Sequence, residues 1–263
     1  MLWTWLSPTL SLTAALVLIA LERRFPYDPR QRLLRTGFFT DLIGYGLIQS
    51  YVLGLCISGG IAWLDRQTGL SRLHLVSDWP IALQVLFFLV THDLYIYWFH
   101  RLQHYSDLLW RTHEAHHSGD DVDWLSGTRS HSLEILINQS IEFAPIALLG
   151  AAPEVALIKA TLDVIWGMYI HSNIDVRSGR WQYFINGPEM HRWHHARELP
   201  APGRNFATKL AIWDHLFGTA HLPPSKPAAY GYDDPAYPRT GFWAWVRQHV
   251  HAFRPPAAPS PPS

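Results

Sequence analysis

The sequence predicts an all-α protein: a multi-pass membrane helical bundle of about four spans or near-spans, with a cytoplasmic cap that is rich in histidine. Residues 2–21 and residues 42–64 carry no charged side chain, and an apolar helix of about 20 residues crosses the hydrocarbon core of a bilayer. Eight histidines gather in three short clusters that follow residue 99. The apolar runs predict the bundle, and the clusters predict the cap.

Charge and cysteine content exclude several partners and cofactors. The 263 residues include 21 basic and 21 acidic side chains. The chain therefore lacks the basic excess of a polyphosphate-binding protein, and nucleic acid is not an expected partner. Cys56 is the only cysteine, which excludes an intrachain disulfide, a cysteine-ligated zinc site and an iron–sulfur cluster. A bound metal would have nitrogen or oxygen ligands.

Residues 1–99 are predicted to form three membrane helices. The first apolar run follows no basic segment and precedes charged residues, so we expect a retained anchor rather than a cleaved signal peptide. The connection between the first two runs contains five arginines, whereas residues 65–78 contain two, and the positive-inside rule places the arginine-rich connection in the cytoplasm. A third span over residues 79–99 then ends on the cytoplasmic side. The five arginines are Arg23, Arg24, Arg30, Arg32 and Arg35.

Residues 100–131 contain the first two histidine clusters, and residues 132–171 are predicted to form a tight helical hairpin in the membrane. Residues 132–149 and 154–170 are mostly apolar and flank a Gly-Ala-Ala-Pro breaker. Helices of this length, at about 1.5 Å per residue, barely cross a bilayer. Ionisable side chains at membrane depth usually face a protein interior or a cavity, so the hairpin should line the path of a substrate. Those in the hairpin are Glu134, Glu142, Lys159 and Asp163.

Residues 172–253 are predicted to form the cytoplasmic cap, which contains the third histidine cluster. This stretch is polar and aromatic, and prolines divide it into short elements. Residues 241–250 interleave aromatic side chains with Arg247 and His249, which favours an interfacial helix, with a packed surface helix as the alternative. Residues 254–263 are rich in proline and alanine and predict a disordered tail.

The three histidine clusters predict a site for two metal ions. Each cluster places imidazoles three or four residues apart, a spacing that puts them on one helix face. One ion takes four to six ligands, so eight imidazoles favour two ions side by side. A single histidine in an apolar setting is more often a hydrogen-bonded core residue, but unpaired buried imidazoles in such number would be costly. The clusters are His100 and His104 in HRLQH, His113, His116 and His117 in HEAHH, and His191, His194 and His195 in HRWHH.

The motifs HRLQHYSDLLWRTHEAHHS, HRWHH and NFATKLAIWDHLFGT resemble those of the fatty acid hydroxylase and sterol desaturase superfamily. The resemblance spans about residues 91–219 and includes the motif order HxxxH, HxxHH, HxxHH. It implies a multi-pass membrane enzyme that binds two non-haem irons and uses dioxygen and two external electrons to hydroxylate or desaturate a lipid. It also implies that the eight cluster histidines are iron ligands, with His171 in IHSN as a further one.

The resemblance leaves the role of His131 open. His131 in RSHSLE lies where many bacterial relatives have a histidine followed by proline, and Ser132 stands in place of that proline here. The residue could bind iron or support a ligand.

Other residues should orient the ligands, because a metal-bound histidine normally donates its second N–H to a carboxylate, a carbonyl or water. Asp93 is the leading candidate, since it precedes His100 by seven residues, or two helical turns on nearly the same face. Asp214 and Glu134 are second choices. His92 lies on the same face as Asp93, and we expect it to have a structural or pocket role. Asp93, His131 and Asp214 are the candidate catalytic residues beyond the ligands.

The expected function is oxygen-dependent hydroxylation of a lipid such as a sterol or a fatty acyl chain in lipid biosynthesis, with desaturation as the close alternative. Oxidation of an unactivated C–H bond requires a redox metal, and zinc has no redox chemistry. No flavin, haem or iron–sulfur motif is visible, so electrons should come from a separate NAD(P)H-linked carrier of the cytochrome or ferredoxin type. The active site is expected on the cytoplasmic face of a membrane, most simply a bacterial plasma membrane.

Two other functions remain open at this stage. His113-Glu114-Ala115-His116-His117 fits the HExxH pattern, in which two histidines bind zinc and the glutamate is the general base. A membrane zinc hydrolase would leave most of the clustered histidines unexplained. A non-catalytic metal-binding membrane protein is the third possibility, although histidine tracts of that kind are usually loose and repetitive.

Overall fold

The computed structural model describes residues 2–198, 203–232, 234, 236–241 and 243–254, and in these residues helices are the regular secondary structure. Within these residues no strand forms, and extended pairing is limited to two isolated bridges, Pro26 with Ile174 and Ala196 with Tyr230. The all-α prediction is confirmed. The helices are α1 (Leu2–Arg24), α2 (Ser50–Thr68), α3 (Ile81–Tyr105), α4 (Asp107–His117), α5 (Ser132–Leu148), α6 (Pro153–His171), α7 (Pro188–His194), α8 (Ile212–Leu216) and α9 (Ala244–His251).

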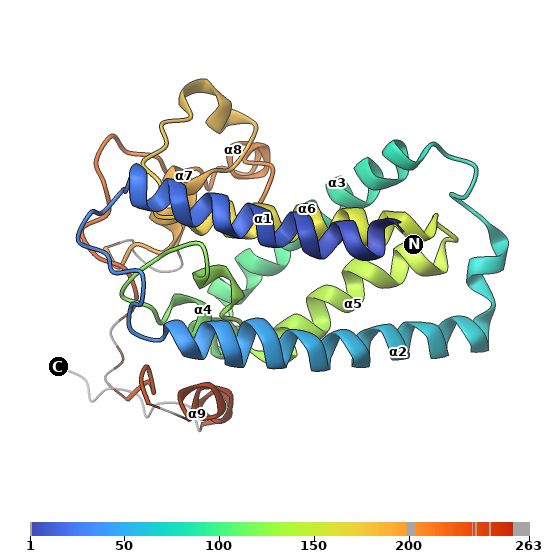
Figure 1. Cartoon of the computed structure of the whole chain (residues 1–263), viewed down its shortest axis with the longest axis horizontal. Helices are drawn as coiled ribbons and strands as arrows, with labels where there is room; N and C mark the ends of the chain where they lie inside the picture. The colour runs from blue at the N-terminus through green and yellow to red at the C-terminus, as the bar shows by residue number, and fades with distance from the viewer. Residues whose placement is uncertain (1, 199–202, 233, 235, 242, 255–263) are drawn as a thin grey trace.

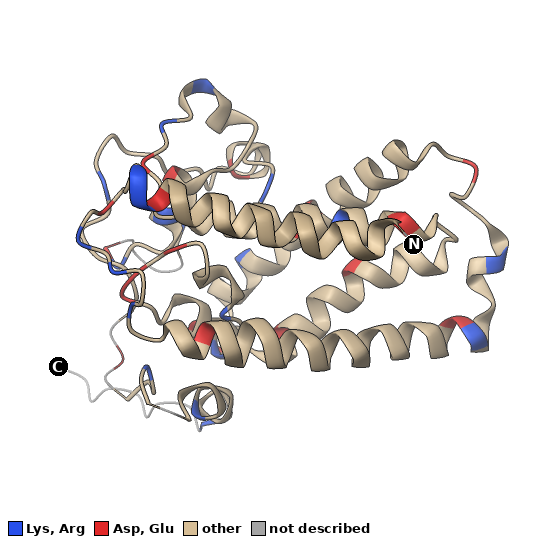
Figure 2. Cartoon of the chain, in the orientation of Figure 1, with Lys and Arg blue, Asp and Glu red and all other residues tan. Residues whose placement is uncertain are grey.

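Five long helices form an elongated bundle, and the shorter helices gather at one of its ends (Figure 1). α1 packs along α6, α2 packs along α5, and α3 contacts α4, α5 and α6. Wide π-helical turns over Thr40–Gln49 precede α2 and continue directly into it. Helices α4, α7 and α8 lie at the end of the bundle where most of the charged residues are also found (Figure 2).

Three helical segments are long and apolar enough to cross a membrane: Leu2–Arg24, Thr40–Thr68 and Ile81–Tyr105. Their bounds agree closely with the predicted spans. Many large apolar side chains on the first two segments point away from the protein, and Leu16 and Leu55 are 60% and 57% exposed. Burial in lipid explains such exposure, since apolar surface of this extent is unfavourable in water. The chain is a membrane protein.

The predicted hairpin forms from α5 and α6, which Leu149 to Ala152 join. Gly150 in this turn has a φ of +73°, and an added Cβ would lie 2.6 Å from the carbonyl oxygen of Ser71. Only glycine fits a left-handed turn with so close an approach. Three ionisable side chains of the hairpin point inward, since Glu134, Glu142 and Lys159 are all buried.

Helix α9 begins three residues later than residues 241–250 predict, and residue 242 lies outside the described residues. Trp245 packs on the π-helical turns at Gly44, where an added Cβ would lie 2.7 Å from the indole Cγ. Val250, near the end of the helix, and Phe253, just after it, are 66% and 70% exposed. The helix therefore packs on the bundle with one face and leaves an apolar face uncovered. The predicted tail also lies outside the described residues from residue 255 onward.

A buried ion network ties the start of the second membrane segment to the loop between α4 and α5. Asp41 accepts from Arg129 at 2.6 and 2.8 Å and lies 2.8 Å from Arg35. Arg35 also makes a two-pronged bond to Asp123, at 2.8 Å for both contacts. All four side chains are buried. Asp41 is the central anion because it contacts both guanidinium groups.

The variant Asp41→Asn is expected to lower the free energy of unfolding in detergent by about 3–5 kcal/mol, because it leaves two buried guanidinium groups short of a counter-charge. Chemical denaturation followed by circular dichroism measures this loss. Asp28→Asn is the matched control, since its ion pair with Arg30 is exposed and such pairs contribute about 0–1 kcal/mol. Equal losses in the two variants would contradict a structural role for the buried network.

Candidate metal centre

The nine histidines predicted as metal ligands lie together at the charged end of the bundle, where they form two groups. In each group the candidate ligand atoms lie within 4.8 Å of one another. The first group has five members and the second has four. The first comprises His100, His104, His113, His117 and His194, and the second comprises His116, His171, His191 and His195.

The second and third sequence clusters each contribute to both groups. On α4, His113 and His117 are four residues apart and join the first group, whereas His116 joins the second. On α7 and at its C-cap the pattern is reversed. His191 and His195, which are four residues apart, join the second group, and His194 joins the first. Residues four apart share a helix face, and the intervening histidine projects from a neighbouring face. Both helices therefore lie between the two groups.

Facing ring nitrogens are spaced as ligands of a common ion would be. His100 and His113 approach with their Nε2 atoms 3.0 Å apart. In the second group the Nε2 atom of His171 lies 3.2 Å from that of His116 and 2.9 Å from that of His191. Two nitrogens that each lie about 2.1 Å from one ion, at a right angle, are about 3.0 Å apart.

Two further Nε2 atoms in the first group lack a hydrogen-bond partner. In the described part of the chain, the Nε2 atoms of His117 and His194 are buried and have no partner. A buried polar atom without a partner is destabilising unless something else binds it. A metal ion would satisfy both nitrogens, so the residues fit such a group.

The opposite ring nitrogen of several histidines is held by a backbone carbonyl oxygen. The Nδ1 atom of His100 lies 2.8 Å from the oxygen of Phe206, and that of His194 lies 2.8 Å from the oxygen of Arg204. Because a carbonyl oxygen only accepts, Nδ1 must donate and Nε2 keeps its lone pair. His116 and His171 have the same arrangement, with the carbonyl oxygens of Arg129 at 3.1 Å and Gly167 at 2.7 Å.

One ligand candidate is oriented by a carboxylate. The Nδ1 atom of His113 lies 3.0 Å from Oε1 of the buried Glu134. Glu134 is one of the two second choices predicted from the sequence for this role. Its position three residues into α5 brings it to the level of the histidines.

Asp93 does not contact a cluster histidine, contrary to the leading prediction. Its carboxylate accepts instead from the backbone N–H groups of Lys209 and Leu210 and from the side chains of Thr208 and Trp213, at 2.9–3.0 Å. The prediction used helical spacing within α3 alone. In the folded chain the segment after the third cluster reaches Asp93 first and occupies both of its oxygens.

Asp214 supports a ligand candidate indirectly. Its carboxylate accepts from the N–H groups of Phe206 and Ala207 at 2.8 and 2.9 Å and from the hydroxyl of Thr219 at 2.6 Å. These bonds fix the peptide whose carbonyl oxygen contacts His100. Asp214 therefore positions the backbone that orients the histidine.

His131 lies outside both histidine groups. It is the N-cap of α5, where its Nδ1 accepts from the N–H of Leu133 at 3.1 Å. Its ring lies against that of His249, with centroids 4.6 Å apart. The adjacent hydroxyl of Ser132 is 2.8 Å from Nε2 of His249. The geometry associates His131 with helix capping and with α9.

Glu114 points away from the histidine groups and binds Arg254 through both carboxylate oxygens, at 2.5 and 2.8 Å. A general base needs to reach the proton that it removes. A carboxylate engaged by a guanidinium on the other side of α4 does not meet this requirement. The geometry therefore provides no support for a zinc hydrolase built on the HExxH pattern.

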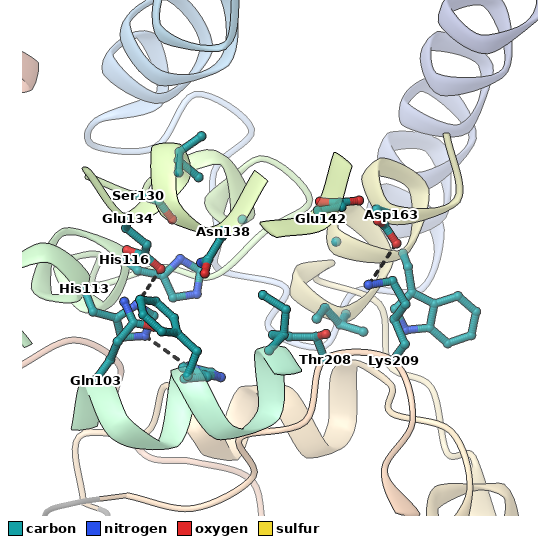
Figure 3. A pocket seen from close by; sticks show the side chains of 18 of the residues that line it. Gln103, His113, His116, Ser130, Glu134, Asn138, Glu142, Asp163, Thr208 and Lys209 are labelled. Atoms are coloured by element: carbon teal, nitrogen blue, oxygen red, sulfur yellow. Dashed lines mark hydrogen bonds and ion pairs between the residues drawn. The ribbon is translucent and has the colours of Figure 1, made fainter. Parts of the chain in front are cut away.

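One cavity of about 220 Å³ adjoins both histidine groups (Figure 3). Its walls include His100 and His113 of the first group and His116, His171 and His191 of the second. Figure 3 shows His113, His116 and Glu134 on one side of this cavity and Glu142, Asp163 and Lys209 on the other. Asn138 of α5 lies between them. The hairpin thus lines the cavity beside the histidines.

A third cluster of candidate ligands, His92, Glu142 and Asp163, holds a lysine instead of a position for a metal ion. The ammonium of Lys159 donates to Glu142, to Asp163 at 2.6 Å and to His92 at 3.1 Å. The protein itself therefore supplies the cation at the centre of these three side chains.

Burial keeps the histidines of α4 and α7 uncharged. Loss of solvent, with a smaller contribution from neighbouring histidines, lowers the pKa of His113, His117 and His195 well below the usual value. Burial likewise lowers the pKa of the remaining members of these clusters. A neutral imidazole has a lone pair on one ring nitrogen, which is the form that binds a metal ion. The other lowered values belong to His116, His191 and His194.

Residues 85–219, about half of the chain, match the family model described as fatty acid hydroxylase. The chain is 30% identical to an ornithine lipid hydroxylase of Rhizobium tropici, in an alignment that covers 90% of this chain and 73% of that protein. It is 32% identical to the alkylglycerol monooxygenase of Homo sapiens, over 54% of this chain and 32% of that protein.

A Delta(7)-sterol 5(6)-desaturase of Aspergillus fumigatus is 28% identical, over 61% of this chain and 57% of that protein. The chain therefore spans only about a third of the monooxygenase and little more than half of the desaturase. No solved structure matches the chain.

The variant Asp93→Asn is expected to lower the free energy of unfolding by at least about 2 kcal/mol, because an amide cannot accept from all four donors that converge on this carboxylate. Denaturation in detergent measures the change. The exposed Asp78 provides the control Asp78→Asn, which should leave stability within about 0.5 kcal/mol. An Asp93→Asn variant as stable as this control would refute the anchoring role.

Proposed function

The chain belongs to the fatty acid hydroxylase family, and from this premise we propose that it is an oxygen-dependent di-iron enzyme that hydroxylates a lipid, with desaturation as the alternative outcome. The family resemblance of the sequence is confirmed. Its relatives are lipid hydroxylases, monooxygenases and a desaturase, so the family comprises lipid-modifying oxidoreductases. The activity of this chain is an inference from those relatives and from its histidine groups.

The observation that carries the proposal is the pair of adjoining histidine groups, one of five and one of four imidazoles. We assign one iron to each group. Two bound irons would supply the redox chemistry by which dioxygen is reduced and a C–H bond is oxidised. Nine imidazoles are more than one ion can bind, which favours two ions over one.

The residues of the chain prepare the site in three ways. Backbone carbonyls and Glu134 hold the Nδ1 protons of five candidate ligands, which leaves their Nε2 lone pairs available to bind iron. Burial keeps the imidazoles neutral. The cavity walls hold the reacting part of the lipid beside both histidine groups, where the lipid would displace water. The overall reaction is R–H + O₂ + 2e⁻ + 2H⁺ → R–OH + H₂O.

The two electrons come from a separate protein in this proposal. The sequence has no flavin, haem or iron–sulfur motif, so a cytochrome or ferredoxin linked to NAD(P)H is the expected donor. We place the histidine groups on the cytoplasmic side, because the arginine-rich connection of residues 23–35 lies at the same end of the bundle (Figure 2). A bacterial plasma membrane is the proposed location.

The relatives provide three classes of candidate substrate: an amino-acid lipid such as an ornithine lipid, an alkylglycerol, and a sterol. A fatty acyl chain is the fourth, from the family name. All have a long apolar body that would stay in the bilayer while a smaller part enters the cavity. We do not favour a zinc hydrolase, because Glu114 is engaged by Arg254, nor a metal carrier, because the relatives are lipid-modifying enzymes.

Metal analysis tests the assignment of two irons. Protein purified anaerobically in detergent should contain two irons per chain, and the iron pair should be oxidised by dioxygen in Mössbauer spectra. His117→Ala and His195→Ala each remove a ligand from a different group, so each should retain about one iron.

His131→Asn is the control for these variants, because asparagine can also cap a helix and His131 lies outside both groups. This variant should retain both irons. A single redox-silent zinc in the wild-type protein, or unchanged iron in both alanine variants, would refute the proposed centre.

Product analysis tests the reaction. With an NAD(P)H-linked reductase and carrier added, the protein should insert one oxygen atom from isotopically labelled dioxygen into a lipid. Loss of two hydrogens without oxygen insertion would identify desaturation instead. Glu114→Gln should retain turnover under this proposal, whereas it should abolish the activity of a zinc hydrolase. Oxygen-independent lipid cleavage that depends on Glu114 would overturn the oxygenase assignment.

A further inference from the structure

A second layer of ionisable side chains lies deeper in the bundle than the histidine groups. Three helices each place one such residue eight positions away from a residue of the histidine end: His92 from His100 on α3, Glu142 from Glu134 on α5, and Asp163 from His171 on α6. Eight residues of helix span about 12 Å. We call His92, Glu142, Lys159, Asp163 and Lys209 the inner polar layer.

The inner polar layer and the histidines line one and the same cavity. His92, Glu142, Asp163 and Lys209 all belong to its wall, together with ligand candidates of both groups. Figure 3 shows the two sets facing each other across the cavity, with Asn138 between them. The cavity of about 220 Å³ is smaller than the roughly 300–1,000 Å³ of typical small-molecule pockets. This volume holds part of a lipid and not a whole one.

The ions within the inner polar layer balance one another. Lys159 is fully buried and directs its three N–H groups at Glu142, Asp163 and His92. Lys209 lies 2.9 Å from the second oxygen of Asp163. Two lysines thus match two carboxylates, so the layer does not need a charged ligand. A ligand could still form hydrogen bonds with single atoms of the layer.

His92 provides a donor with no acceptor. Because the ammonium of Lys159 can only donate, Nδ1 of His92 must accept, and the ring proton of the neutral imidazole is on Nε2. Among the described residues this Nε2 has no hydrogen-bond partner, although His92 is only 9% exposed. The nearest carboxylate oxygen, Oε2 of Glu142, is 3.8 Å away, which is too far for a hydrogen bond.

These two atoms, 3.8 Å apart, suit a bridging group that both accepts and donates a hydrogen bond. A ligand group there would accept from Nε2 of His92 and donate to Oε2 of Glu142. A hydroxyl does both, whereas an ammonium cannot accept and an ether oxygen cannot donate. An unsatisfied buried donor is destabilising, so filling the gap with a hydroxyl is favourable.

We propose that His92 and Glu142 bind a hydroxyl group of the lipid substrate and so determine which carbon lies beside the histidines, about 12 Å along the helices. This inference rests on the proposed lipid hydroxylase function and specifies its substrate as a lipid that bears a free hydroxyl. The hydroxyl could come from a glycerol ether or from a sterol. Both residues are specificity-determining in this proposal, and neither binds iron.

Equilibrium binding to the iron-loaded protein, without reductant and without oxygen, tests the inference independently of turnover. The ligands are hexadecylglycerol, its dimethyl ether, cholesterol and an ornithine lipid. Wild-type protein should bind at least one of the free alcohols tenfold or more tightly than the dimethyl ether. The tighter of the two alcohols identifies the source of the hydroxyl.

Two variants of one residue locate the hydroxyl site. His92→Phe lacks the donor and should lose the preference for the alcohol, whereas His92→Gln can donate from its amide and should restore most of it. Glu154→Gln, on the same helix as Asp163 but outside the cavity lining, is the matched control and should keep the full preference. Iron content should equal that of the wild type in all three variants.

If wild-type protein binds neither alcohol more tightly than the dimethyl ether, the inference is overturned, and the oxygenase proposal still stands. Tighter binding of the ornithine lipid that persists in His92→Phe would also overturn it, because an ammonium would then be the preferred group. Failure of the oxygenase proposal has a different signature, namely absence of the two irons in the wild-type protein. The comparison of the alcohols with the dimethyl ether uses only wild-type protein, so it tests the inference even if a substitution prevents folding.

Discussion

An imidazole that binds a metal through Nε2 carries its proton on Nδ1, and a hydrogen-bond acceptor at Nδ1 fixes this tautomer and the orientation of the ring. In this protein the holding groups are mostly backbone carbonyl oxygens, from Phe206, Arg129, Gly167 and Arg204. A carbonyl is fixed only if its own peptide is fixed. The positions of the loops around the histidines therefore control the geometry of the candidate metal centre.

Carboxylates that never touch a histidine anchor those loops. Asp214 binds the N–H of Phe206, whose carbonyl faces His100. Asp41 binds the guanidinium of Arg129, whose carbonyl faces His116. Asp93 secures the segment around Lys209. Buried carboxylates with several donors are stable only with good geometry, so the centre depends on packing well beyond its ligands.

The cavity joins two kinds of polar chemistry at different depths of the bundle. The histidine end has neutral imidazoles that suit metal ions, and the inner polar layer has lysine–carboxylate pairs beside the unpartnered Nε2 of His92. Ionisable groups in a membrane bundle are costly and are usually associated with function. The two layers lie eight residues apart on each of three helices, so the distance between them is fixed at about 12 Å.

The sequence by itself determined the helical class, the three apolar spans, the hairpin and the nine histidines, because periodicity, length and spacing act locally along the chain. Only the tertiary structure decided how those histidines divide, since His116 and His117 are neighbours in sequence yet belong to different groups. It also reassigned Asp93 from a histidine partner to a loop anchor and brought Glu134 to His113. Such contacts join residues from different helices and loops. Packing and competition among hydrogen-bond donors select the partners, and the spacing of residues along one helix does not specify either.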